Sequence, residues 1–255
     1  MLHNYPTLFV SWRSPSTRSI HPVGRLKFVA DPKYYEYHYE YRYIRSARRA
    51  AKEGFTPFPD FPKLENVYRD KELFPMFSNR SMSDNRPGFA SFLEALGLSA
   101  ESANPMAILA RTGGRRVTDQ IELFPEPSLE ADGCYVTHCL LRSIRYMPQP
   151  GTDERIAKLK VEEQLYWMPD PQNPVDPYAV AVRTIDNYMV GYVPSYLTAD
   201  LRLLKAECPD VKLFVSRVNH PPAEAHHRLL VKIVSCRPPG FQPFQTDDYL
   251  PIGVG

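Results

Sequence analysis

The chain has 255 residues, of which 43% are hydrophobic, 24% charged and 12% aromatic, and its formal net charge is +2. This composition is typical of a globular protein with one large domain or two ordinary ones, and it excludes extensive disorder. The small net charge also excludes a protein that grips many phosphates, so any nucleic-acid contact should be local and use few residues.

In the first half, four segments rich in β-branched and aromatic residues predict strands, and four short segments with helix start or stop signals predict helices. The expected strands are residues 7–12, 21–29, 34–43 and 117–125. The expected helices are residues 46–54, 69–77, 86–97 and 104–114. The last helix has Asn104 as its N-cap, Pro105 at its first position and Gly113 after its end.

The run YYEYHYEYRY, residues 34–43, alternates aromatic and polar side chains at the period of a strand. One aromatic and one polar face are typical of a half-buried strand in a small sheet, and we favour this interpretation over a platform for stacking bases. Basic residues that follow the run keep the second interpretation open. The tyrosines of the aromatic face are Tyr35, Tyr37, Tyr39, Tyr41 and Tyr43, and the basic residues are Arg42, Arg45, Arg48, Arg49 and Lys52.

The stretch EPSLEADG, residues 126–133, predicts a boundary between a domain at 1–130 and a domain at 131–255 that includes the C-terminal tail. Beyond it, short strands are expected at residues 135–147, 154–160, 164–168, 178–185, 188–193, 211–218 and 227–235. A helix is expected at 195–207, with Ser195 as N-cap and Leu197, Leu201 and Leu204 on one face. The predicted fold class is α+β, with a small α/β cap-like domain before a compact β-barrel with one helix.

No apolar run approaches the roughly 20 residues needed to cross a bilayer, and the N-terminus lacks the pattern of a signal peptide. The cysteines, Cys134, Cys139, Cys208 and Cys236, have no framework spacing, so we expect buried or free thiols in a cytoplasmic protein. Cys134 and His138 would face one side of a strand and Cys139 the other, so neither a zinc site nor another cofactor is predicted.

The segment LYWMPDPQNPVDPYAVAVRTIDNYMVGYVPSYLTADL resembles the signature of the HIRAN domain, which occurs in helicase-like transcription factor, in related repair ATPases and as a bacterial module. The pattern is an apolar strand, a D/E-P-x-N-P-x-D turn, an A-[VI]-x-V strand, a G-[YH]-[VL] strand and a helix. The match covers about residues 135–236. Its residues are Asp170, Pro171, Asn173, Pro174, Asp176, Ala179, Val180, Val182, Gly191, Tyr192 and Val193.

The HIRAN resemblance implies binding of single-stranded DNA at a free 3′ end. Arg145 and Tyr146 stand where the family carries its Arg-Tyr pair, the guanidinium for a phosphate and the ring for a base. Asp176 matches the turn acid near the 3′-hydroxyl; a carboxylate accepts a hydrogen bond from a hydroxyl and repels a phosphate. Tyr192 stands where the family carries His or Tyr and could add a hydroxyl.

Val175 occupies the position at which the family carries an aromatic residue, so a stacking contact worth about 1–3 kcal/mol is expected to be missing. Tyr178, three residues on, is a candidate to fill part of that gap. Without the resemblance, the polar residues of this segment would be interpreted as ordinary turn formers that bond to their own backbone, and Tyr146 and Tyr192 as barrel aromatics.

In the first half, VGRLKF, the aromatic strand, ELFPMFSNR and ILARTGG resemble the N-terminal subdomain of HipA-type serine kinases, a small α/β cap. This resemblance implies contact with a protein partner. The stretch TGGRR offers backbone N–H groups and two cations to a phosphate or an acidic partner, although a helix C-cap with solvated arginines is the favoured interpretation. The candidate partner-binding residues are Arg45, Arg48, Arg49, Arg115 and Arg116.

The sequence carries no phosphate-cradling GxxxxGK[ST], HExxH or GxSxG motif. We therefore expect a non-catalytic bacterial protein that binds single-stranded DNA or a 3′ end beside a separately encoded nuclease, helicase or defence complex. The alternative is an interaction or antitoxin-like subunit that regulates a HipA-type kinase without binding DNA. Val175 and the near-neutral second half favour the alternative, whereas Arg145, Tyr146 and Asp176 favour DNA.

Overall fold

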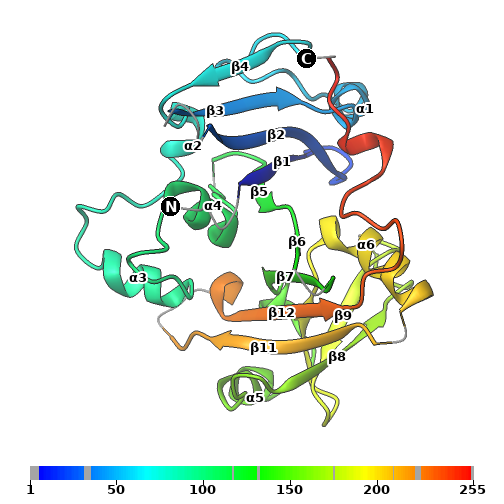
Figure 1. Cartoon of the computed structure of the whole chain (residues 1–255). Coiled ribbons are helices and arrows are strands. Elements are labelled where there is room, and N and C mark those ends of the chain that lie inside the picture. The colour runs from blue at the N-terminus through cyan, green and yellow to red at the C-terminus, as the bar shows by residue number, and fades with distance from the viewer. Residues whose placement is uncertain are drawn as a thin grey trace. The chain divides into compact units, whose positions relative to one another are not determined.

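The computed structural model describes residues 6–31, 36–116, 118–130, 133–174, 176–208, 210–221 and 225–253. The chain divides into two compact units, one made of Met1–Glu126 with Phe244–Gly255 and the other of Pro127–Pro243. Each unit has its own antiparallel sheet (Figure 1).

The first unit is built on a five-stranded sheet in the order β4-β3-β2-β1-β5. Its strands are β1 Thr7–Arg13, β2 Ile20–Asp31, β3 Glu36–Tyr43, β4 Val67–Asp70 and β5 Ile121–Pro125. Its helices are α1 Ser46–Lys52, α2 Pro75–Ser78, α3 Phe89–Ala95, α4 Pro105–Thr112 and the 3₁₀ helix η3 Asp247–Tyr249. The helix expected at 69–77 is wrong over its first half, because Val67–Asp70 pair with β3 as an edge strand.

The capping prediction for α4 is confirmed. The Oδ1 atom of Asn104 accepts a hydrogen bond of 2.9 Å from the Ala107 N–H, and Pro105 is the first helical residue. Gly113 follows the helix in the left-handed conformation, with φ of 73°.

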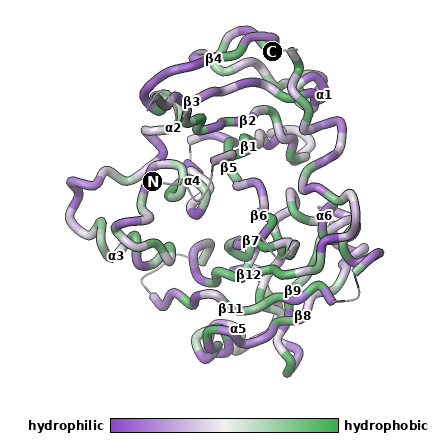
Figure 2. The backbone as a smooth tube through the Cα atoms, viewed as in Figure 1, coloured by the Kyte–Doolittle hydropathy of each residue, from purple (hydrophilic) through white to green (hydrophobic). Residues whose placement is uncertain are grey.

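The tyrosine run forms β3, and its interpretation as a half-buried strand is confirmed over the described residues. Tyr39, Tyr41 and Tyr43 are at most 7% exposed, whereas Tyr37 near the strand start is 53% exposed. Tyr35 lies outside the described residues. Figure 2 colours β3 as hydrophilic, because the hydropathy scale counts tyrosine as mildly polar although these rings lie in the core.

The buried tyrosines hold the proline-rich segment that follows α1. The Tyr41 ring stacks on Phe61 with 4.1 Å between centroids. The Tyr43 hydroxyl donates to the Phe61 carbonyl (2.9 Å) and accepts from the Phe58 N–H (2.7 Å). Burial raises the pKa of Tyr43 to about 12, so its hydroxyl remains a donor at neutral pH.

The C-terminal residues belong to the first unit, which corrects the prediction that they form the tail of the second domain. Phe244 packs edge-on against Phe9 and Phe124, with centroid distances of 5.3 and 5.5 Å. Farther on, the Ile252 N–H donates to the Tyr43 carbonyl (3.2 Å). These contacts join residues about 120 to 240 positions apart in the chain, so no local sequence pattern could predict them.

The second unit contains a seven-stranded antiparallel sheet in the order β10-β9-β8-β11-β12-β7-β6. Its strands are β6 Ser128–Leu129, β7 Tyr135–Leu140, β8 Gln164–Pro169, β9 Val180–Arg183, β10 Met189–Tyr192, β11 Lys212–Val218 and β12 Leu229–Ser235. Its helices are α5 Thr152–Ala157, α6 Ser195–Glu207 and the 3₁₀ helices η1 Ile144–Tyr146 and η2 Ala225–His227.

The long helix α6 faces the core as predicted, because Leu197, Leu201 and Leu204 are at most 1% exposed. Its N-cap is Pro194 and Ser195 is its first residue, which corrects the predicted cap.

The strand expected at 154–160 is wrong, because residues 152–157 form α5. Thr152, Ile156 and Leu159 are buried at the spacing of a helix face, i, i+4 and i+7. Asp153 and Glu154 in the first turn also favour a helix start, because their charges oppose the helix dipole.

The second sheet is open, so the predicted barrel is not confirmed. The broader prediction, a mixed α/β fold made mostly of sheet, is confirmed. β10 and β6 are the edges of the strand order. One isolated antiparallel bridge, between Arg142 and Tyr192, joins the segment after β7 to β10.

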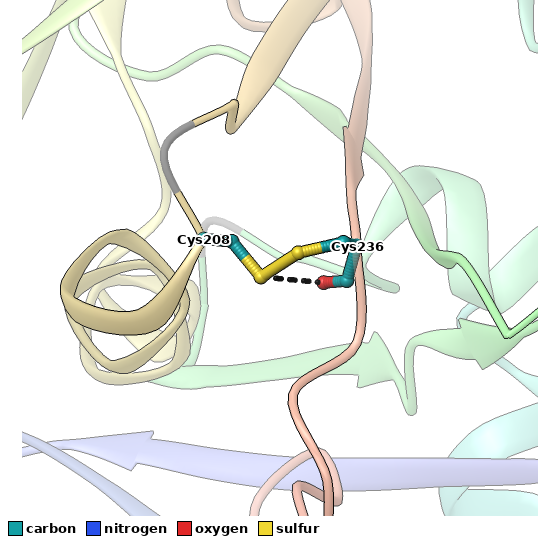
Figure 3. The surroundings of a disulfide bond; sticks show 2 residues. All are labelled: Cys208 and Cys236. Carbon is teal, nitrogen blue, oxygen red and sulfur yellow. Dashed lines mark hydrogen bonds between the residues drawn. A yellow bond between two sulfur atoms is a disulfide. The ribbon is translucent and has the colours of Figure 1, made fainter.

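Cys208 and Cys236 form a disulfide bond, which corrects the expectation of free thiols (Figure 3). Cys208 follows α6 and Cys236 follows β12, and their Cα atoms lie 6.1 Å apart. The two residues are 28 positions apart, so only the packing of the helix beside the strand brings them together.

None of the helices in the described part of the chain has the length and apolar character that spanning a bilayer requires.

Candidate nucleic-acid interface

Arg145 and Tyr146 lie together on the short helix η1 after β7. Ser143 starts the turn with a positive φ of 60°, and Ile144, only 4% exposed, anchors it in the core. The next two side chains are exposed, Tyr146 to 66%. The Arg145 guanidinium lies 4.6 Å from the Tyr146 ring centroid and donates to the Tyr146 hydroxyl. The buried Ile144 thus anchors a short helix that presents a cation and an aromatic ring to solvent.

The turn between β8 and β9 is organised by its own polar side chains. The Asn173 Oδ1 atom accepts from the Asp176 N–H (3.1 Å), and the Asp176 Oδ1 atom accepts from the Tyr178 N–H (2.8 Å). These bonds confirm that the turn residues bond to their own backbone, as Asx side chains do. No hydrogen bond between described residues reaches the other carboxylate oxygen of Asp176, which is half-buried. Val175 lies outside the described residues.

Tyr192 connects this turn to the segment that carries Arg145. Its main chain exchanges two hydrogen bonds with Arg142, of 2.8 and 2.9 Å. Its hydroxyl donates to the Asp170 carboxylate (2.8 Å) at the start of the turn. Burial and this bond raise the pKa of Tyr192, so the hydroxyl stays a donor. Tyr192 is therefore a positioning residue, whose hydroxyl is already committed to Asp170.

Gly191 permits the close approach of β10 to Arg142. Its φ is 140°, and a Cβ atom there would lie 2.8 Å from the Arg142 carbonyl oxygen. A side chain would force these backbones apart, which explains the glycine of the G-Y-V motif.

Tyr178 points toward α6 and is 57% exposed. The Arg202 guanidinium lies 4.2 Å from its ring centroid. One turn farther along the helix, the Lys205 ammonium lies 5.9 Å from the Trp167 ring centroid. These two cations over aromatic rings were not among the residues predicted from the sequence. The i, i+3 spacing of Arg202 and Lys205, away from the leucine face of α6, was the available signal.

The structure links Arg145, Tyr146, Tyr192 and the turn through the Arg142–Tyr192 pairing and the Tyr192–Asp170 bond. It does not join them into one closed cluster: among the described residues, no hydrogen bond or ring contact connects Arg145 or Tyr146 with Asp176 or Tyr178.

The arginines predicted to bind a partner are engaged within the first unit. Arg45, the N-cap of α1, pairs with Asp247 (3.4 Å) of the C-terminal tail. Within α1, Arg49 pairs with Asp248 of the tail and Arg48 with Glu65 (3.8 Å) in the loop before β4. Arg115 lies 4.0 Å from Glu122, and Arg116 donates to the Asn79 carbonyl. The side chains of Arg45, Arg48 and Arg49 are all more than half exposed, so each of these ion pairs contributes about 1 kcal/mol or less to stability.

No group of three or more His, Cys, Asp or Glu side chains in the described ranges is placed to hold a metal ion.

Residues 135–234 match the family model of the HIRAN domain. A crystal structure of a protein from Lactobacillus plantarum is similar at 15% identity and a TM-score of 0.32, over 39% of this chain and 89% of that one. The HIRAN domain of human HLTF is similar at 17% identity and a TM-score of 0.29, over 40% of this chain and 74% of that one. No curated protein matches the chain.

The family model covers no part of the first unit, so its likeness to the HipA cap stays a prediction. For the second unit the family match agrees with the resemblance in the sequence, and it supports a HIRAN domain at residues 135–234.

Proposed function

We propose that the second unit binds single-stranded DNA and holds the strand at its free 3′ end. At the coarse level, the HIRAN domain suggests binding of DNA. The observation that carries the finer proposal is the exposed Arg145–Tyr146 pair on the buried anchor Ile144. A guanidinium held beside a ring suits a nucleotide, because it offers a phosphate contact and a stacking face together.

Each candidate residue has a separate role in this proposal. Arg145 pairs with a phosphate and Tyr146 stacks on a base. The open oxygen of Asp176 accepts a hydrogen bond from the terminal 3′-hydroxyl and repels a 3′-phosphate. Tyr178, with Arg202 over its ring, supplies the stacking contact that Val175 does not offer. Tyr192 holds the turn through Asp170.

In this proposal the chain is an accessory without chemistry of its own, and a nuclease, helicase or defence complex acts on the DNA that it holds. The first unit would then contact the protein partner, as its likeness to the HipA cap implies.

The second candidate function is regulation of a HipA-type kinase through the first unit. It is supported by a cavity of about 330 Å³ whose lining of apolar and charged side chains suits a mixed side-chain contact with a protein partner. Of the predicted partner-binding residues, Arg116 contributes to this cavity. The lining is Phe58, Pro59, Asp60, Pro75, Met76, Asn79, Arg80, Arg116 and Ile121.

The test is a fluorescence-anisotropy titration of the full chain at one stated low salt concentration. The ligands are a single strand with a 3′-hydroxyl, the same strand with a 3′-phosphate, a circular single strand and a blunt duplex. We expect the chain to bind the single strand with a free 3′-hydroxyl more tightly than the other three ligands. Arg145→Ala should weaken binding to that strand about tenfold, since one charge-assisted phosphate contact is lost.

Lys158→Ala is the matched control, because it removes one exposed cation from the same unit, at the end of α5. It should leave the preference unchanged. Equal, weak and salt-sensitive binding of all four ligands by the wild-type chain would contradict the end-binding proposal and favour the kinase alternative.

A further inference from the structure

The sheet of the first unit carries a group of cations on the face opposite its core. The strand register places Arg25 opposite Arg42, Lys27 opposite Glu40, and Glu40 opposite Arg69. Alternate residues of a strand face opposite sides, so these five side chains share one face of β2, β3 and β4, and the buried Tyr41 and Leu26 point the other way. We call Arg25, Lys27, Arg42 and Arg69 the cationic block.

One buried carboxylate neutralises part of this block. Glu40 is 8% exposed, and it accepts hydrogen bonds from Arg42 (2.6 Å) and from the Nε atom of Arg69 (3.0 Å). Burial by itself would raise the pKa of Glu40, but these bonds outweigh it and the pKa is lowered. Glu40 is thus ionised and its charge is taken up by two of the four cations.

Arg25 and Lys27 lack such a partner. Among the described residues neither makes a side-chain hydrogen bond or an ion pair, and the Nε atoms of Arg25 and Arg42 are buried without a partner. Burial and then the neighbouring cation lower the pKa of each group, Arg42 acting on Arg25 and Arg25 on Lys27. The carboxylates of Glu126 and Glu40 raise both pKa values, but the net shift of each is downward. Like charges directly opposite each other on adjacent strands destabilise a sheet. An anion bound here would relieve this repulsion.

We propose that the cationic block binds phosphate groups of a nucleic-acid strand, as a second contact beyond the one in the HIRAN domain. Alternate residues of one strand lie about 7 Å apart, so Arg25 and Lys27, the two cations that Glu40 does not hydrogen-bond, can contact one or two phosphates. A guanidinium matches phosphate oxygens in a bidentate fork and is weakly hydrated. This inference rests on the proposed function in one respect: it takes the ligand to be the same nucleic-acid strand that the second unit binds.

The test is the salt dependence of affinity for a 3′-hydroxyl single strand, measured on the full chain and on Arg25→Gln combined with Lys27→Gln. Each phosphate contact with a single strand contributes about 0.7 to the slope of log affinity against log salt, so the double variant should lose about 1.4 from the slope. The preference for 3′-hydroxyl over 3′-phosphate should stay unchanged, since that pocket belongs to the other unit. The variant should melt no lower than the wild type, because it loses two half-buried cations that make no hydrogen bond among the described residues and relieves the repulsion between Arg25 and Arg42.

The matched control is Lys52→Gln combined with Lys63→Gln, which removes the same charge from two exposed positions of the first unit. Its slope should equal that of the wild type. An unchanged slope in the Arg25, Lys27 variant, or the same decrease in the control, would overturn the inference.

The two proposals fail in different ways. If all four DNA ligands bind equally but the slope still falls in the Arg25, Lys27 variant alone, the cationic block is supported and end recognition is not. If no DNA binds and polyglutamate binds the wild type but not the variant, the block serves an acidic protein segment and the nucleic-acid inference is overturned.

Discussion

At the scale of single residues, Asp176 has two oxygens with different uses. Its Oδ1 atom closes the turn by accepting from the Tyr178 N–H (2.8 Å), and its other oxygen meets no partner among the described residues. Removing the whole side chain would therefore remove the hydrogen bond that closes the turn as well as any contact with a ligand. A replacement that keeps an acceptor and removes the charge separates these roles.

We expect Asp176→Asn to leave the melting temperature nearly unchanged and to reduce the discrimination against a 3′-phosphate. An asparagine still caps the Tyr178 N–H and still bonds a hydroxyl, but it no longer repels a phosphate. Anisotropy titration with the two single strands measures this ratio, and calorimetry serves as the control for folding. An unchanged ratio would show that the carboxylate plays no part in end recognition.

At the scale of elements, β3 combines a tyrosine face in the core with Glu40 on the other face. The alternation of the sequence predicted both faces. It could not predict that Glu40 would lie between Arg42 and Arg69, because β4 was expected to be part of a helix and only the strand pairing brings Arg69 opposite Glu40.

We expect Glu40 to make the stability of the first unit sensitive to acid. Its folded pKa is lowered from the usual 4.5. Its contribution is therefore fully present above pH 4.5 and is lost as the pH falls through the folded pKa, where the unfolded chain binds the extra proton. Chemical denaturation of the wild type and of Glu40→Gln, at about pH 6 and about pH 3, measures the loss. The variant should be less stable at the higher pH and should lose less on acidification; parallel losses would contradict the assignment.

At the scale of the whole molecule, two units with separate sheets are joined in one chain, and a disulfide lies within one of them. Cys208 and Cys236 close a loop of 28 residues at the ends of α6 and β12. In the chain-entropy account, closing such a loop in the unfolded state contributes about 3.5 kcal/mol.

We expect Cys208→Ser to lower the unfolding transition of the second unit and to leave that of the first unit in place. Differential scanning calorimetry of the full chain, with and without reductant, measures both transitions. Reductant should shift the wild type toward the variant and have no effect on the variant. A shift of both transitions together would mean that the two units unfold cooperatively, and no shift would mean that the bond adds no stability.

Sequence patterns of short range predicted much of the candidate site. The D-P-x-N-P-x-D motif identified the turn, because Asx side chains bond backbone groups only two or three residues away. Gly191 and Tyr192 also followed from their motif. Arg202 did not, because its contact with Tyr178 joins the turn to a helix 24 residues later.

Local sequence patterns predicted most of the strands and helices and the side chains that face the core, since the periods of 2 and 3.6 residues arise from local backbone geometry. They were wrong for α5, which was expected to be a strand, and for Arg69 of β4, which was expected to lie in a helix. Tertiary structure alone decided that Phe244 docks on Phe9, that Cys208 bonds Cys236, that the second sheet stays open, and that Arg25 lies against Arg42. These contacts join residues far apart in the chain, and their energies depend on which elements pack together.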